Sequence, residues 1–97
     1  MKFTLLIKEE ADLDMAEAYE CYEEKSKDLG DEFLIELDEY FSSLESNPYL
    51  CSVRYKSYRL FPLKRFPYLI VYEIENENVI VYSVFHMSKD PKKRYEV

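Results

Sequence analysis

Two long apolar runs near the end of the chain constrain the fold more than any other feature. The runs are Tyr68–Ile74 (YLIVYEI) and Val79–His86 (VIVYSVFH), and four polar residues (ENEN) separate them. Runs of this length, rich in β-branched and aromatic residues, predict β-strands. A short polar connection between two such strands predicts an antiparallel hairpin.

The register of this hairpin follows from its turn. With Asn76 and Glu77 at the tip, Ile74 would pair with Val79. Because side chains alternate between the faces of a strand, this register divides the hairpin into two faces. The face that we assign to the core carries Tyr68, Ile70, Tyr72, Ile74, Val79, Val81, Ser83 and Phe85. The face that we predict to be a more open groove carries Leu69, Val71, Glu73, Ile80, Tyr82, Val84 and His86.

The first half of the chain has a different hydrophobic period. In residues 2–8 (KFTLLIK) every second residue, Phe3, Leu5 and Ile7, is apolar and would share one face, which predicts a strand. Apolar residues then recur at helical spacing over residues 9–27 and, after a break at Leu29-Gly30, over a second segment. An Asn-Pro pair at residues 47–48 ends this second helix. Two helices joined by so few residues are expected to pack as an antiparallel hairpin.

The remaining segment completes the fold prediction. Residues 54–64 predict one further strand, broken near Pro62. The order β-α-α-β-β-β predicts an α+β fold with the helical hairpin packed on one face of a four-stranded, mainly antiparallel sheet. A length of 97 residues predicts a single domain, residues 1–97.

Charge is divided unevenly between the two halves of the chain. The net charge is −7. Residues 1–52 contain four lysines and fifteen acidic residues, a net charge of −11, whereas residues 53–97 contain nine basic and five acidic residues, a net charge of +4. This division predicts two unlike surfaces, although a solvated acidic helix surface that binds nothing is equally compatible with it. The acidic total argues against strong non-specific binding of nucleic acid.

Targeting and metal-binding patterns are missing from the sequence. No run approaches the roughly 18 apolar residues of a membrane span, and the start, MKFTLLIKEEADL, does not match a secretory signal. We therefore expect a cytoplasmic protein that does not bind membranes. Cys21 and Cys51 match no metal-ligand spacing, and we expect reduced thiols, no metal and no cofactor.

Four short sequences occur in an order typical of one family. They are Asn47-Pro48, Phe66-Pro67-Tyr68, Ile70-Val71-Tyr72 and the HxxKDP segment His86–Pro91. Together they resemble the RelE/ParE superfamily, the toxins of bacterial type II toxin–antitoxin modules, over nearly the whole chain. The resemblance implies a four-stranded antiparallel sheet with a helical hairpin, and a cognate antitoxin whose extended C-terminal region wraps the toxin. HxxKDP is similar to the ParE-type ending, where arginine is more usual than Lys89.

The resemblance leaves two activities open. RelE-like members cut messenger RNA on the ribosome, and ParE-like members inhibit DNA gyrase. RNA cleavage needs a base, an acid and positive charge near the phosphate. RelE-like ribonucleases typically have an arginine where this chain has Leu69, and leucine cannot stabilise an anion. We therefore predict a ParE-like toxin that inhibits its target by binding. The alternatives are a RelE-like mRNA endoribonuclease and an inactive relative that binds only its antitoxin.

Candidate site residues follow from these alternatives. If the protein cleaves RNA, the catalytic candidates are His86, Lys89 and Tyr95. The candidates for binding a target or phosphates are Arg59, Lys64, Arg65, Lys93 and Arg94. Each has a structural interpretation as well: His86 as a strand-end residue, and the basic residues as strand-edge or solvated cations. A homodimer and a toxin–antitoxin hetero-oligomer both remain open.

Overall fold

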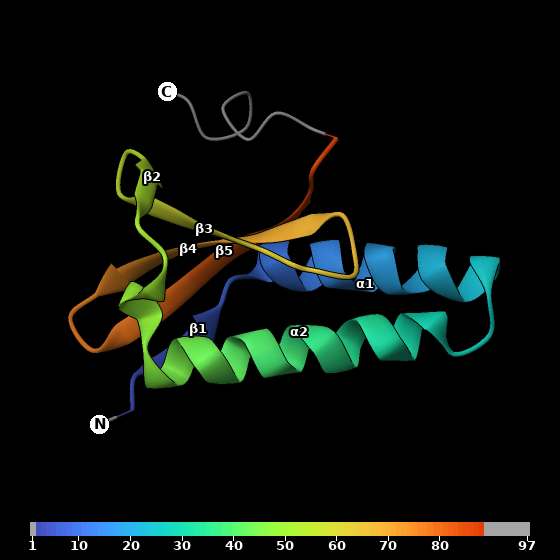
Figure 1. Ribbon diagram of the computed structural model, residues 1–97, viewed down its shortest axis with the longest axis horizontal. Coiled ribbons are helices and arrows are strands. Elements are labelled where there is room, and N and C mark those ends of the chain that lie inside the picture. Colours follow the sequence, from blue (N-terminus) through green and yellow to red (C-terminus); the bar gives the residue numbers. More distant parts are fainter. Residues whose placement is uncertain (1, 89–97) are drawn as a thin grey trace.

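The computed structural model describes residues 2–88 and shows two layers. Figure 1 shows a hairpin of two helices lying on one side of a twisted sheet. The elements are β1 (Thr4–Ile7), α1 (Glu9–Lys25), α2 (Leu29–Ser46), a 3-10 turn η1 (Pro48–Leu50), β2 (Val53–Tyr55), β3 (Tyr58–Pro62), β4 (Tyr68–Glu75) and β5 (Asn78–His86). The predicted α+β class and the position of the helical hairpin are confirmed.

Over residues 2–88 the sheet has five strands in the order β1-β5-β4-β3-β2, so the predicted number of four was wrong. β1 runs parallel to β5, and the other pairs are antiparallel. The difference arises because the single strand predicted over residues 54–64 is a tight hairpin of β2 and β3. Lys56, in its turn, has a φ of 55°, a left-handed conformation typical of two-residue hairpin turns. Pro62 is the last residue of β3.

The helices meet closely near Gly30. The break between them lies at residues 26–28, with Asp28 at a φ of 68°, so Gly30 belongs to the first turn of α2 and does not interrupt it. A Cβ atom on Gly30 would lie 2.7 Å from the backbone oxygen of Tyr19. The Gly30 N–H donates to Oε2 of Glu23 at 2.7 Å. The glycine therefore allows contact between the helix backbones.

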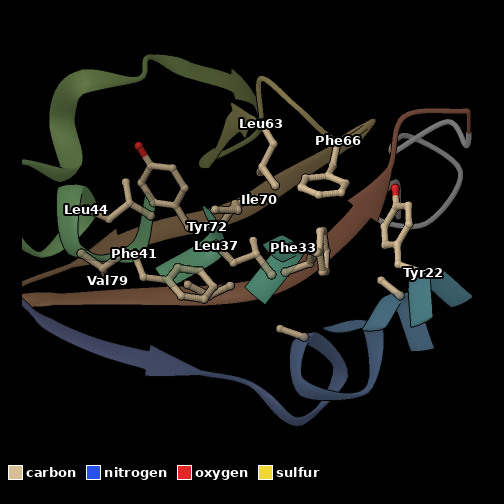
Figure 2. Close-up of a cluster of buried hydrophobic side chains, with 14 residues drawn as sticks. Tyr22, Phe33, Leu37, Phe41, Leu44, Leu63, Phe66, Ile70, Tyr72 and Val79 are labelled. Carbon is tan, nitrogen blue, oxygen red and sulfur yellow. The ribbon is translucent and has the colours of Figure 1, made fainter. Parts of the chain in front are cut away.

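The core lies between the helices and the sheet. Figure 2 shows Phe33 and Leu37 of α2 packed with Ile70 and Tyr72 of β4, and all four side chains are almost inaccessible to solvent. The phenol of Tyr72 donates to the carbonyl oxygen of Pro48 at 2.7 Å. Burial of a large apolar side chain contributes about 1.5–3 kcal/mol, so this layer dominates the stability of the fold.

The β4–β5 register agrees with the prediction near the turn only. Ile74 pairs with Val79 and Tyr72 with Val81, as predicted. The register then shifts, and Tyr82 is an extra residue on β5 without a partner on β4. Such a β-bulge reverses the alternation of side chains beyond it.

Val84, Phe85 and His86, beyond the bulge, therefore lie on the faces opposite to those predicted. Val84 is buried in the core beneath the helices. His86 pairs with Tyr68, whose ring packs against two aromatic rings of the helices. Phe85 pairs with Leu69 on the other face of the sheet. The prediction that His86 lies in the open groove was wrong, because the bulge could not be recognised in the sequence.

Candidate functional site

The sheet face that points away from the helices, here called the far face, is mostly apolar. Strand register places on it Tyr58, Leu60, Leu69, Val71, Glu73, Ile80, Tyr82 and Phe85. Tyr58, Leu60, Leu69 and Tyr82 are partly exposed, whereas Val71, Ile80 and Phe85 are buried. Glu73 is the one charged residue in this set. The far face therefore presents partly exposed aromatic and aliphatic side chains beside Glu73, and the exposed Glu75, two residues later on β4, adds a second carboxylate at its edge.

The carboxylate of Glu73 is held by two hydroxyl groups. The phenol of Tyr82 donates to Oε1 at 2.9 Å, and the hydroxyl of Ser57 donates to Oε2. The ring of Tyr58 meets that of Tyr82 edge to face, with centroids 5.3 Å apart. Burial raises the pKa of Tyr82 to about 12, and the hydrogen bond to Glu73 and its charge act in the same direction. The phenol is therefore neutral at physiological pH and fixes the orientation of the carboxylate.

Sequence reasoning placed Glu73 and Tyr82 on one face but missed Ser57 and Tyr58 as their partners. The two residues reach this cluster because the chain turns at Lys56-Ser57. The sequence feature that could have revealed this turn is the polar pair Lys56-Ser57 between two tyrosines, which is compatible with a two-residue hairpin turn.

Leu69 has apolar neighbours on both adjacent strands. It pairs with Pro62 of β3 and Phe85 of β5. This is the position where the resemblance to ribonucleases would require arginine. A phosphate group in this position would meet hydrocarbon, which offers neither a hydrogen bond nor positive charge. The local chemistry favours contact with another apolar surface.

Arg59 is engaged by the fold itself. Its guanidinium donates to the carbonyl oxygen of Cys51 at 2.5 Å and lies 5.2 Å from the centre of the Tyr49 ring. Arg59 pairs with Tyr72, whereas His86 pairs with Tyr68 four residues earlier on β4. Four residues of strand separate these positions by roughly 13 Å. The structure therefore does not bring Arg59 and His86 into one phosphate site.

Arg65 binds the acidic surface of α2. Its guanidinium forms an ion pair with Glu32 at 2.6 Å, and its backbone N–H donates to Glu36 at 3.1 Å. The backbone N–H of the neighbouring Lys64 donates to the phenol of Tyr40 at 2.9 Å. These contacts tie the β3–β4 connection to α2. These contacts match the structural interpretation of the two basic residues.

His86 lies in a cleft between α1 and the ends of β4 and β5. Its ring meets Tyr68 edge to face at 5.0 Å, and its Nδ1 accepts the backbone N–H of Ser88 at 3.1 Å. The cleft, of about 210 Å³, is also lined by Asp14 and Glu17 of α1. These carboxylates make the surroundings of the imidazole acidic, which is unfavourable for binding a phosphate.

Four predicted site residues fall outside the described part of the chain. They are Lys89, Lys93, Arg94 and Tyr95. Within residues 2–88, no group of three or more histidine, cysteine, aspartate and glutamate side chains could hold a metal ion. None of the helices described in the structure is long and apolar enough to cross a membrane.

Comparison with models of known protein families shows to which family the chain belongs. The model of the family described as "ParE toxin of type II toxin-antitoxin system, parDE" matches residues 5–91. The chain belongs to the ParE toxin family. A solved structure titled "Chromosomal ParDE TA system from P. aeruginosa" superposes with a TM-score of 0.78 at 13% sequence identity, covering 88% of this chain and 96% of that chain. This likeness shows that the chain has the same fold as that solved structure. No curated protein matches the sequence.

Proposed function

We propose that this ParE-family chain is a cytoplasmic toxin that inhibits DNA gyrase by binding to it, and that a cognate antitoxin neutralises it. The observation that carries the proposal is the apolar surroundings of Leu69 on the far face. Aromatic side chains are enriched at the centres of protein–protein interfaces, whereas binding to nucleic acid relies on lysine and arginine. The chemistry of the far face suits a protein target.

The aromatic cluster on the far face supplies the proposed contact. Tyr58 and Tyr82 are partly exposed, and the bond from Tyr82 to Glu73 fixes the position of its ring. A fixed aromatic side chain loses little conformational entropy when a partner covers it. Leu60 and Leu69 extend this surface along β3 and β4. We propose that these four side chains contact the target.

The ribonuclease alternative has less support from the described residues. It would combine His86 with Lys89 and Tyr95, but His86 and Leu69 lie on opposite faces of the sheet. The imidazole is also beside carboxylates of α1. We therefore propose that the toxin acts without catalysis. In this proposal residues 1–97 work as one domain, and the neutralised form is a toxin–antitoxin hetero-oligomer.

Controlled expression in a bacterial host tests the proposed function. The expected result is growth arrest with filamentation and an SOS response, because inhibited gyrase leaves damaged DNA. Co-expression of the antitoxin from the adjacent reading frame should restore growth. Rapid loss of ribosome-bound transcripts without an SOS response would contradict the proposal and favour RNA cleavage. No growth defect at all would identify an inactive relative.

A pair of variants separates the far face from the rest of the surface. Leu69→Lys places a charge at the centre of the proposed contact and should reduce growth arrest. Leu50→Lys makes the same change at a side chain of η1 that is 46% exposed, and should leave growth arrest intact. Equal soluble expression of the two variants is required for the comparison. Equal toxicity of the two would contradict the assignment of the far face.

A further inference from the structure

The outer surface of the helical hairpin, which points away from the sheet, carries large aliphatic side chains. Leu13 is 59% exposed, Leu34 38% and Ile35 62%. Figure 1 shows α1 and α2 lying side by side on one side of the sheet, and the exposed fractions place these three side chains on the solvent-facing surface of that layer. Hydrophobic residues gathered on a helix surface mark interaction sites more often than isolated ones do.

A groove runs between the two helices at this surface. It has a volume of about 390 Å³ and is lined by Asp12, Met15, Ala16, Tyr19 and Glu20 of α1 and by Leu34 of α2. The five residues of α1 are spaced at i, i+3, i+4, i+7 and i+8, which forms one continuous stripe on a helix. The groove is therefore a property of the helix pair and follows its axis.

The close contact between the helices at Gly30 lies beside the groove. A Cβ atom on Gly30 would lie 2.7 Å from a ring carbon of Tyr19, and Tyr19 also lines the groove. Leu34 follows Gly30 by one helical turn, so its side chain lies on the same side of α2. Leu34 of α2 and the small Ala16 of α1 line the groove from the two helices. Such a pairing of a large and a small side chain leaves a shallow apolar depression.

The rims of the groove are acidic. Asp12 and Glu20 line it on α1, and Asp31 and Asp38 lie three residues before and four residues after Leu34 on α2. The charge of Asp31, together with that of Glu23, raises the pKa of the Tyr19 phenol, so acidic side chains lie close to this part of the groove. The first 52 residues together have a net charge of −11. A negative potential therefore extends over the whole helical layer.

This charge decides between possible occupants. A second copy of the chain would bring two acidic rims together, and like charges across an interface oppose association. A nucleic acid or an anionic membrane would be repelled for the same reason. A partner with basic residues on both sides of an apolar stripe would pack its stripe on the apolar floor of the groove and place its basic residues beside the two acidic rims.

We propose that this interhelical groove binds an amphipathic, basic α-helix of a partner protein. Apolar side chains of the partner at i, i+3 or i+4, and i+7 fill the groove beside Ala16 and Leu34. Asp12 and Glu20 are eight residues apart on α1, or about 12 Å along its axis. The partner therefore carries lysines or arginines about two turns apart on each side of its apolar stripe. The inference rests on the helical surface and is independent of the proposed target.

A peptide titration tests the inference. The probe is a synthetic 18-residue helix with leucines at i, i+3, i+4 and i+7 and lysines on both flanks, added to the full chain labelled with ¹⁵N. The expected result is saturable chemical-shift changes centred on the amides of Ala16, Tyr19 and Leu34, weakened by salt. A peptide of identical composition in scrambled order, without an apolar stripe, should bind at least about tenfold more weakly.

Matched variants locate the interaction. Ala16→Glu places a charge in the floor of the groove at an exposed position and should weaken binding of the peptide at least about tenfold. Ser52→Glu adds the same charge at an exposed position outside the helices and should change little. The amide spectrum of each variant confirms that the fold is intact.

Three results would overturn the inference. The first is equal binding of the ordered and scrambled peptides, which would indicate attraction by net charge alone. The second is a set of shift changes that lies outside the groove or is unaffected by Ala16→Glu. The third is a concentration-dependent shift of Ala16 and Leu34 without peptide, which would show that a second copy of the chain occupies the groove.

Discussion

Tyr72 and Tyr82 show how the two faces of one sheet differ. Tyr72, on the face beneath the helices, is fully buried and donates to a backbone carbonyl. Tyr82, on the far face, is partly exposed and donates to the Glu73 carboxylate. The phenol of Tyr72 thus holds the η1 turn against the core, whereas the phenol of Tyr82 orients a carboxylate on the surface. We infer that fold stability depends on the helix side, whereas the far face is available for binding.

The largest expected effect comes from emptying the core. Phe33→Ala removes a fully buried ring that contacts Tyr22, Phe66 and Tyr68, and should lower the free energy of unfolding by about 3–5 kcal/mol. Leu69→Ala, on the far face, should cost only about 1 kcal/mol because this side chain is partly exposed. Urea denaturation of the two variants measures both values. Similar losses would contradict the contrast between the faces.

A smaller effect is expected at the contact between the helices. Alanine in place of glycine inside a helix normally stabilises a protein by about 1 kcal/mol. Gly30→Ala should instead destabilise it by about 1–3 kcal/mol, because the new Cβ atom would lie 2.7 Å from the backbone oxygen of Tyr19. Thermal unfolding reports the sign directly, with Ser42→Ala on the exposed surface of α2 as the control. An increase in the melting temperature of Gly30→Ala would show that the helices separate easily.

Removing single phenol groups compares the two faces most closely. Tyr72→Phe leaves the buried carbonyl oxygen of Pro48 without its donor and should cost about 1–3 kcal/mol. Tyr82→Phe should cost less than about 1 kcal/mol, because water can reach the carboxylate of Glu73. Chemical denaturation of both variants at pH 7 makes the comparison. A larger loss for Tyr82→Phe would reverse the assignment of the two faces.

The smallest expected effect appears at alkaline pH. The pKa of Tyr82 is raised to about 12, whereas an unfolded tyrosine has a pKa near 10. The phenol therefore contributes its full stabilisation below about pH 10, and this contribution is lost as the pH rises toward 12. Tyr82→Phe should make the dependence of the melting temperature on pH shallower between about pH 10 and 12. An unchanged slope would indicate that the phenol is solvated like an unfolded one.

The parts of the fold with strong periodicity could be predicted from the sequence. The helical stripes and the pairing of Ile74 with Val79 are confirmed because each depends on many consecutive side chains. The bulge at Tyr82 could not be predicted, since every residue of VIVYSVFH is compatible with a regular strand. Its position follows instead from tertiary contacts: Asp14 of α1 accepts hydrogen bonds from the Ser83 hydroxyl and the Val84 N–H.

The same limit applies to the candidate site. Leu69 lies on the far face as predicted, because the extra residue of the bulge is on β5 and β4 itself is regular. The pairing of β4 with β3 has no register shift. His86 lies on the opposite face from the predicted one, because one extra residue on β5 reverses its direction. Contacts such as that of Arg59 with the Cys51 carbonyl join elements distant in the chain, and no local pattern reveals them.

A gyrase supercoiling assay with the purified protein tests the central claim most directly. The toxin, released from its antitoxin, should inhibit supercoiling in proportion to its concentration, and Leu69→Lys should need at least about tenfold more protein than Leu50→Lys for the same inhibition. The same preparation should leave messenger RNA intact in a reconstituted translation reaction. Unimpaired supercoiling together with cleaved messenger RNA would contradict the account.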